Sequence, residues 1–214
     1  MTSGADHYFS ARPKAKPRPG QVRLPLAGVE RDLVLRTDAG TFSAAAVDPG
    51  TRFLLDDGAR PDPGPATLVD VGCGYGPIAV ALALWAPEAT VWAIDVNERA
   101  LGLTRANADE LGVGDRVRTA PPEGVPDGLV ADGIWSNPPI RVGKAALHGL
   151  LATWLARLRP DGEAHLVVAK NLGADSLARW LTDQGHPVSR RGSRRGYRLL
   201  DVGAAAGPSA PTTP

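Results

Sequence analysis

The strongest constraint on the fold is an apolar run that ends in three glycines, TLVDVGCGYGPI at residues 67–78. Its branched residues suit a strand that is buried on both faces. The glycines allow a sharp turn and the close approach of a ligand, and the helix that follows would point unpaired N–H groups at that ligand. Pro77 suits the first position of this helix, where a missing N–H is no loss. The stretch predicts a strand, a ligand-binding loop and a helix, with a plain turn as the alternative.

A carboxylate at Asp95 supports the ligand-binding interpretation. It follows the next strand-like run, residues 90–94, about 20 residues beyond Gly76. In a strand–helix–strand unit, this spacing places the carboxylate at the tip of the second strand, where it can accept both hydroxyls of a ribose. The spacing therefore indicates an adenosine-type ligand. Pro77 stands where the dinucleotide fingerprint has its third glycine, which disfavours NAD.

Three segments together resemble a known family. VDVGCGYGPIA, AIDVNERAL and IWSNPPI resemble the S-adenosylmethionine-dependent methyltransferases, which have a Rossmann-like α/β fold with a seven-stranded sheet and helices on both faces. More narrowly, the chain is similar to the small-domain group that includes the guanine-N2 methyltransferases of small-subunit ribosomal RNA. Further segments that resemble this group are residues 6–10, 47–51, 137–144 and 196–200. The resemblance covers most of residues 6–201.

The resemblance implies S-adenosyl-L-methionine as the cofactor. In the resembling proteins the Gly-Thr turn at residues 50–51 helps to close over the methionine end of the cofactor, and a simple connector is the alternative here. An acidic residue after the third strand commonly holds the adenine amine, but prolines occupy that neighbourhood and Glu123 is the nearest candidate. The expected cofactor-binding residues are Thr51, Asp70, Gly72, Gly74, Gly76, Asp95, Val96 and Glu123.

The Asn-Pro-Pro-Ile segment carries the predicted chemistry. If the Asn137 side-chain oxygen and the Pro138 carbonyl each accept one N–H of an exocyclic amine, the nitrogen lone pair can be aimed at the sulfonium methyl group, and the growing positive charge is stabilised. The prolines stiffen the loop before the substrate arrives. Ile140 offers only an aliphatic face where the superfamily often has an aromatic residue to stack on the base. The predicted catalytic residues are Asn137, Pro138, Pro139 and Ile140; a rigid turn without chemistry is the alternative.

Charge is uneven along the chain although the net charge is only +1. Basic residues crowd residues 12–23 and 190–198, and such clusters can contact phosphates or form a solvated face. The predicted RNA-binding residues are Arg141, Lys144, Arg194 and Arg195. The single cysteine, Cys73, is interpreted as a small residue that fills the glycine turn, and the 4 histidines show no metal-ligand spacing. We therefore expect no metal.

A chain of 214 residues suits one domain. We expect a basic, proline-rich mobile arm at residues 1–20, a single methyltransferase domain at 21–202 and a disordered tail at 203–214. Within the domain, residues 21–60 would form N-terminal strands and a short helix, and 67–202 the cofactor-binding core. Expected strands are 21–26, 33–37, 67–71, 90–94, 116–119, 133–136, 164–169 and 197–202; expected helices are 51–57, one begun by Pro77 and stopped by Pro87, 97–111, 145–158 and 176–184. The absence of a signal pattern and of a membrane-length apolar run makes the cytoplasm the default location.

The leading hypothesis is an N-methyltransferase that acts on guanine N2 of small-subunit (16S) ribosomal RNA, with ribosomal RNA or the small ribosomal subunit as partner. Adenine N6 or a protein glutamine is an alternative amine, because Asn-Pro-Pro serves all three. An alternative of another class is a catalytically inactive RNA-binding or ribosome-assembly module. The oligomeric state cannot be read from the sequence, and a monomer is favoured.

Overall fold

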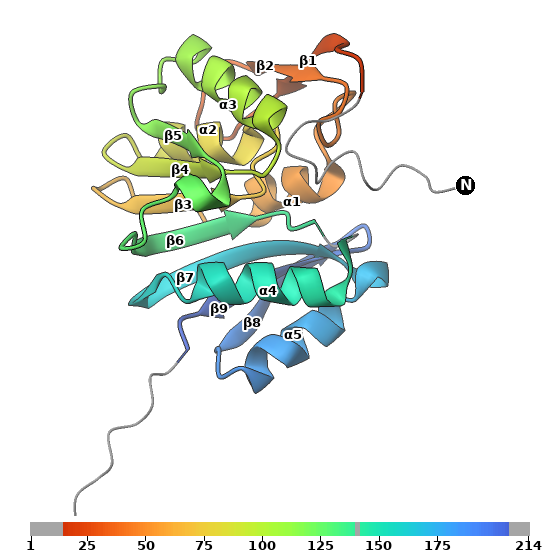
Figure 1. The fold of residues 1–214 in the computed structure, drawn as a ribbon, viewed down its shortest axis with the longest axis vertical. Helices are drawn as coiled ribbons and strands as arrows, with labels where there is room; N and C mark the ends of the chain where they lie inside the picture. Colours follow the sequence, from red (N-terminus) through yellow and green to blue (C-terminus); the bar gives the residue numbers. More distant parts are fainter. Residues whose placement is uncertain (1–14, 140–141, 206–214) are drawn as a thin grey trace, which may run out of the picture.

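A mixed sheet of seven strands forms the centre of the protein (Figure 1). The computed structural model describes residues 15–139 and 142–205. The strand order is β5-β4-β3-β6-β7-β9-β8, and β9 runs antiparallel to both of its neighbours. The predicted Rossmann-like fold with a seven-stranded sheet is thus confirmed. The strands are β3 (Thr67–Val71), β4 (Thr90–Ile94), β5 (Val117–Ala120), β6 (Ala131–Ser136), β7 (Leu158–Ala169), β8 (Val188–Arg194) and β9 (Tyr197–Gly203).

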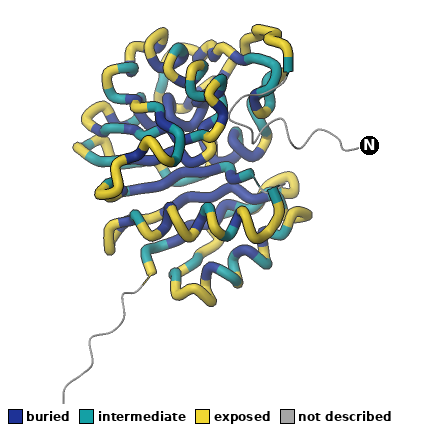
Figure 2. The backbone as a smooth tube through the Cα atoms, in the orientation of Figure 1, coloured by how far each residue is buried: buried dark blue, intermediate teal, exposed yellow. Residues whose placement is uncertain are grey.

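Helices cover both faces of this sheet. Alternate residues of a strand point to opposite faces, so Leu68 of β3 joins a core with α1, α2 and α3, whereas Val69 joins a second core with α4 and α5. The central strands are accordingly buried along their length (Figure 2). The helices are α1 (Pro49–Asp57), α2 (Pro77–Trp85), α3 (Glu98–Glu110), α4 (Lys144–Leu155) and α5 (Ala174–Asp183), with the 3₁₀ turns η1 (Pro122–Gly124) and η3 (Lys170–Leu172).

A separate two-stranded sheet, β1 (Pro19–Leu24) and β2 (Leu33–Asp38), packs beside α2 and α3. Its attachment is polar as well as apolar. The Asn107 side chain of α3 accepts the Arg36 N–H at 2.7 Å and donates to the Tyr75 carbonyl at 2.8 Å, so it joins β2 to the glycine loop. β1 begins two residues before the expected strand and ends before Pro25, which removes residues 19 and 20 from the predicted mobile arm.

Most predicted elements have their expected places, with two corrections. The predicted helix over 145–158 ends at Leu155. Leu158 of β7 already pairs with Ala131 of β6, and the segment predicted as a turn, Arg159–Gly162, forms a bulge within β7 before Glu163 pairs with Gly133. The sequence analysis also missed β8. This strand forms a hairpin with β9 through Arg195 and Gly196, whose φ angles of 47° and 85° suit a tight two-residue turn. Between β5 and β6 the chain forms only the short 3₁₀ turn η1.

Candidate active site

The glycine loop joins β3 to α2 at the carboxyl edge of the sheet. Gly72 and Gly74, with φ angles of 78° and 57°, line a cavity of about 830 Å³, and a Cβ added at Gly74 would meet no atom within 4 Å. Gly76 serves a different purpose. Its φ is 90°, and a Cβ there would lie 2.8 Å from Thr104 Cγ2 of α3, so it allows close packing of loop and helix. Two of the three glycines therefore line the cavity, and the third allows the loop to pack against α3.

Asp95 directly follows β4 and accepts a backbone hydrogen bond from the glycine loop. One carboxylate oxygen accepts the Gly74 N–H at 2.9 Å, and the other accepts the Asn97 N–H at 2.9 Å. Burial raises the pKa of Asp95 above its ordinary value, although the hydrogen bonds from Asn97 and Gly74 offset part of that effect. A carboxylate offers about four lone-pair sites, so both oxygens can still accept ribose hydroxyls. Asp95 and Val96 both line the cavity, which fits an adenosine-type cofactor.

Asp70 lies beneath the loop and does not line the cavity. It is fully buried, and its Oδ2 accepts the Ala79 N–H of α2 at 3.0 Å. Burial raises its pKa to about 8. Glu123, the candidate for the adenine contact, lies in η1. The preceding residue, Pro122, lines the cavity, but Glu123 does not. The structure thus places neither of these two expected cofactor ligands on the cavity wall.

The Asn-Pro-Pro segment lies beside the glycine loop, because it follows β6, which pairs with β3. Asn137, Pro138 and Pro139 all line the cavity, and a Cβ at Gly72 would lie 3.9 Å from Pro139 Cδ. The Asn137 Nδ2 donates to Asp48 Oδ1 at 2.8 Å and to Thr51 Oγ1 at 3.0 Å. Thr51 belongs to α1 and lines a smaller adjoining pocket with Gly72 and Asn137. Ile140 and Arg141 lie outside the described residues.

Other walls of the cavity come from residues that the sequence analysis did not single out. One wall is a stripe on α4 with a spacing of four residues, which presents Ala146, Leu150 and Trp154. The spacing of this stripe is visible in the sequence, but nothing there indicates that it faces a ligand. Tyr197, at the start of β9, and Phe42 complete the rim. Both are aromatic residues that only the fold brings to the Asn-Pro-Pro segment.

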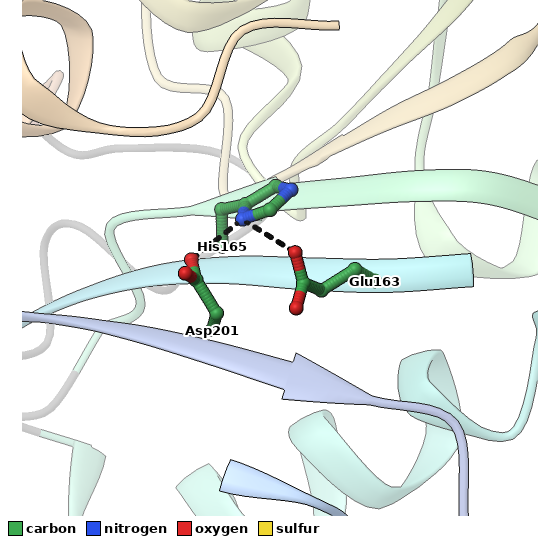
Figure 3. Close-up of side chains that lie close together, drawn as sticks. All are labelled: Glu163, His165 and Asp201. Atoms are coloured by element: carbon green, nitrogen blue, oxygen red, sulfur yellow. Dashed lines mark hydrogen bonds and ion pairs between the residues drawn. The ribbon is translucent and has the colours of Figure 1, made fainter. Parts of the chain in front are cut away.

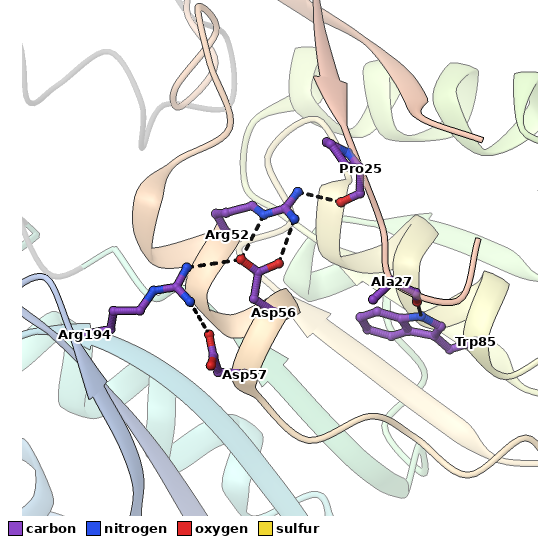
Figure 4. A network of polar contacts seen from close by, with 7 residues as sticks. All are labelled: Pro25, Ala27, Arg52, Asp56, Asp57, Trp85 and Arg194. Carbon is purple, nitrogen blue, oxygen red and sulfur yellow. Dashed lines mark hydrogen bonds and ion pairs between the residues drawn. The ribbon is translucent and has the colours of Figure 1, made fainter. Parts of the chain in front are cut away.

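The predicted RNA-binding arginines have unequal surroundings. Arg194 is engaged within the protein, since it donates to Asp57 at 2.7 Å and to Asp56 at 3.2 Å of α1 (Figure 4). Its guanidinium also lies over the Phe53 ring. Arg195 is exposed at the tip of the hairpin. Elsewhere in the 190–198 cluster, Arg191 pairs with Asp201 and Arg198 with Asp175. Lys144 is exposed at the first turn of α4.

One group of possible metal ligands lies outside the cavity (Figure 3). Glu163 and His165 of β7 meet Asp201 of β9, with His165 Nδ1 2.8 Å from Asp201 Oδ1 and 3.7 Å from Glu163 Oε2. Arg191 already occupies the other Asp201 oxygen at 2.8 Å. Burial raises the pKa of Asp201, but the hydrogen bonds from His165 and Arg191 outweigh it and leave that pKa below its ordinary value. The spacing of residues in the sequence could not reveal this group, because two different strands contribute to it. The expected absence of a metal stays a prediction.

Comparison with known proteins identifies the family. Residues 32–208 match the methyltransferase small domain. The chain belongs to this family. The predicted family and the S-adenosylmethionine-dependent methyltransferase class are thereby confirmed, and the geometry of the glycine loop and Asp95 fits that cofactor. In the part of the chain that the structure describes, no helix has the length and apolar character to cross a membrane.

Relatives of this small-domain methyltransferase include proteins that act on ribosomal RNA. The uncharacterized protein YbxB of Bacillus subtilis is 33% identical over 199 residues, which cover 92% of this chain and 97% of that protein. Ribosomal RNA large subunit methyltransferase G of Streptomyces avermitilis is 37% identical over 146 residues, covering 63% of this chain and 37% of the relative. Among solved structures, the T. thermophilus 16S rRNA N2 G1207 methyltransferase (RsmC), in complex with AdoMet and guanosine, aligns with a TM-score of 0.72 and 21% identity over 86% of this chain and 50% of that chain. The chain therefore spans half or less of these two RNA methyltransferases.

Proposed function

We propose that this small-domain methyltransferase transfers a methyl group to an exocyclic amine of ribosomal RNA, most specifically guanine N2 of 16S ribosomal RNA. The observation that carries the proposal is that Asn137 and Pro138 line the same cavity as Gly74 and Asp95. Gly74 and Asp95 suit the adenosine cofactor, and Asn137 and Pro138 offer acceptors for an amine. A volume of about 830 Å³ lies within the usual range for ligand sites and suits a cofactor and a nucleoside together.

The residues of this chain would divide the work as follows. Asp95 binds the ribose hydroxyls, and the glycine loop lets the cofactor approach the backbone. S-adenosylmethionine supplies an activated methyl group on its sulfonium. The Asn137 side-chain oxygen and the Pro138 carbonyl each accept one N–H of the target amine, which turns the nitrogen lone pair toward the cofactor side of the cavity and stabilises the positive charge that grows on nitrogen. The methylated nitrogen then loses a proton to water, so no strong general base is required.

Guanine N2 is favoured over other amines by the relatives. The aligned structure with the TM-score of 0.72 is named as a guanine-N2 enzyme of 16S ribosomal RNA, and the Streptomyces relative is also a ribosomal RNA methyltransferase. We infer that exposed cations at Lys144 and Arg195 contact the RNA backbone, whereas Arg194 contributes mainly through its contacts with α1. A ribosomal RNA substrate also agrees with the expected cytoplasmic location.

The decisive experiment is transfer of a labelled methyl group to 16S and 23S ribosomal RNA and to small subunits from a strain that lacks this protein. We expect label in 16S ribosomal RNA, as N2-methylguanosine after digestion to nucleosides. Label only as N6-methyladenosine would move the target to adenine, and label only in ribosomal protein would move it to glutamine. A protein that binds S-adenosylmethionine but labels none of these would refute the proposed substrate.

A further inference from the structure

Asp48 makes a contact that its role as a helix cap does not require. Its Oδ1 accepts the Gly50 N–H at 2.8 Å and the Thr51 N–H at 3.1 Å, which caps the N-terminus of α1. The same oxygen accepts the Asn137 Nδ2 at 2.8 Å, from a segment 89 residues further along the chain. Serine would cap the helix about as well as aspartate. Aspartate differs from serine in one respect, because an ionised carboxylate can only accept hydrogen bonds, whereas a hydroxyl can also donate one.

This property decides which end of the Asn137 amide faces the cavity. The oxygen and the NH₂ group of an asparagine are close in size, and a half-turn of the amide exchanges them. A target amine that donates N–H needs the oxygen. The Thr51 hydroxyl, at 3.0 Å, can donate or accept and would tolerate either orientation, whereas the Asp48 carboxylate tolerates only the NH₂ group. With both amide hydrogens directed to Asp48 and Thr51, the oxygen is left for the substrate.

Packing holds Asp48 in this position. A Cβ added at Gly50 would lie 2.8 Å from Tyr197 Cε1 and 2.9 Å from Asp48 Oδ1, so the turn has little room to move. The helix that follows is fixed from two sides, since Arg52 donates to the Pro25 carbonyl and Arg194 of the C-terminal hairpin bonds Asp56 and Asp57 (Figure 4). The cap and its helix therefore form a rigid support for the amide.

We propose that Asp48 is a positioning residue for methyl transfer, which acts by fixing the Asn137 amide with its oxygen toward the target amine. This inference rests on the proposed function, because it concerns the same reaction. It adds the N-cap residue of α1 to the site and explains why an aspartate rather than a serine stands there.

The first test is Asp48→Ser, which keeps a capping oxygen but replaces the obligate acceptor with a hydroxyl that can also donate. The Asn137 amide can then take either orientation, so we expect kcat to fall roughly ten- to a hundredfold, as for the loss of one hydrogen bond to a charged group. The Kd for S-adenosylmethionine and the KM for RNA should stay within about threefold of the parental values. Asp115→Ser is the matched control, since its side chain is 77% exposed and is not part of the cavity lining, and it should leave kcat unchanged.

The second test adds a carboxylate at position 137. Asn137→Asp alone places two carboxylates 2.8 Å apart, so the pair must share a proton and activity should fall as the pH rises. In the double variant, Asp48→Ser with Asn137→Asp, the serine oxygen can still cap the helix while its hydroxyl donates to the new carboxylate, whose second oxygen still faces the cavity. Burial and then the Asp48 charge raise the pKa of Tyr75, so this neighbour stays neutral in both variants. We expect the double variant to restore kcat at least tenfold above Asp48→Ser and to remove the pH dependence.

The outcomes separate this inference from the proposed function. Parental kcat in Asp48→Ser, or a double variant no better than either single one, would overturn the inference while the methyltransferase assignment stands. If the parental protein labels no ribosomal RNA, the proposed function has failed. Urea unfolding of the parent, the two single variants and the double variant then tests the contact between Asp48 and Asn137. Coupling between the two substitutions, with the stability of Asn137→Asp falling as the pH rises, supports this contact; strictly additive free energies of unfolding refute it.

Discussion

Replacing Asp95 with alanine should weaken cofactor binding in two ways. The variant loses the carboxylate that would accept two ribose hydroxyls, and it also loses the acceptor that holds the Gly74 N–H at 2.9 Å and the Asn97 N–H at 2.9 Å. Hydrogen bonds to a charged group contribute about 1.5–3 kcal/mol, so the affinity for S-adenosylmethionine should fall roughly ten- to a hundredfold. Because the glycine loop loses part of its support as well, the larger value is expected.

Isothermal titration calorimetry with S-adenosylmethionine measures this change directly, with Asp115→Ala as an exposed control and NAD as a control ligand. The parental titration should also depend on pH. The pKa of Asp95 is raised by burial, so the carboxylate gains its proton, and the affinity declines, at a higher pH than for an ordinary aspartate. An unchanged Kd in Asp95→Ala, or tight binding of NAD, would refute the assignment of this carboxylate to the ribose.

Three further predictions concern turnover, RNA binding and stability. Asn137→Ala should lower kcat on the order of a hundredfold with nearly parental cofactor affinity, and labelled methyl transfer at the parental rate would exclude the acceptor role. Arg195→Ala should weaken RNA binding and reduce the salt dependence of that binding by about one unit of log slope. Equal salt slopes for Arg195→Ala and the parent would argue against the phosphate contact. Arg194→Ala breaks the contacts with Asp56 and Asp57, so it should mainly lower the melting temperature. Asp70 keeps its proton in the folded state up to about pH 8, whereas the unfolded chain loses it near pH 4, so its contribution to stability falls as the pH rises between these values. Asp70→Asn cannot ionise, and urea unfolding from about pH 5 to 8 should show a flatter profile than the parent.

Local patterns were sufficient to predict the cofactor half of the protein. A buried strand, a glycine turn and Pro77 define β3, the loop and α2, and the spacing to Asp95 adds the end of β4. These elements are formed by residues close together in the chain, so propensity and spacing carry the information. The start of α3 is also local, since the helix expected over 97–111 begins at Asn97, whose side chain accepts the Arg99 N–H at 3.0 Å as an N-cap.

The parts that sequence reasoning missed depend on contacts between distant segments. Val188–Arg194 is rich in arginine and mostly exposed, so its strand character comes from pairing with β9 and not from an apolar alternation. The sequence around Asp48 indicates only a turn, and the hydrogen bond between Asp48 and Asn137 exists only because the fold brings the two residues together. His165 and Asp201, which are 36 residues apart, meet only because β7 and β9 pair. None of these contacts leaves a periodic signal in the sequence.

The order of strands at one edge of the sheet has a consequence for how the protein folds. β9 lies between β7 and β8, so β8 has no place in the sheet until the strand that follows it has been synthesised. The expected cofactor-binding residues Gly72, Gly74 and Asp95 lie between β3 and β6, and this half of the sheet can assemble from chain that leaves the ribosome earlier. α1 precedes all of these strands, yet Arg194 and Tyr197 from the hairpin complete its surroundings. During synthesis, the part of the cavity proposed for the cofactor is therefore expected to form first, and the part proposed for the amine last.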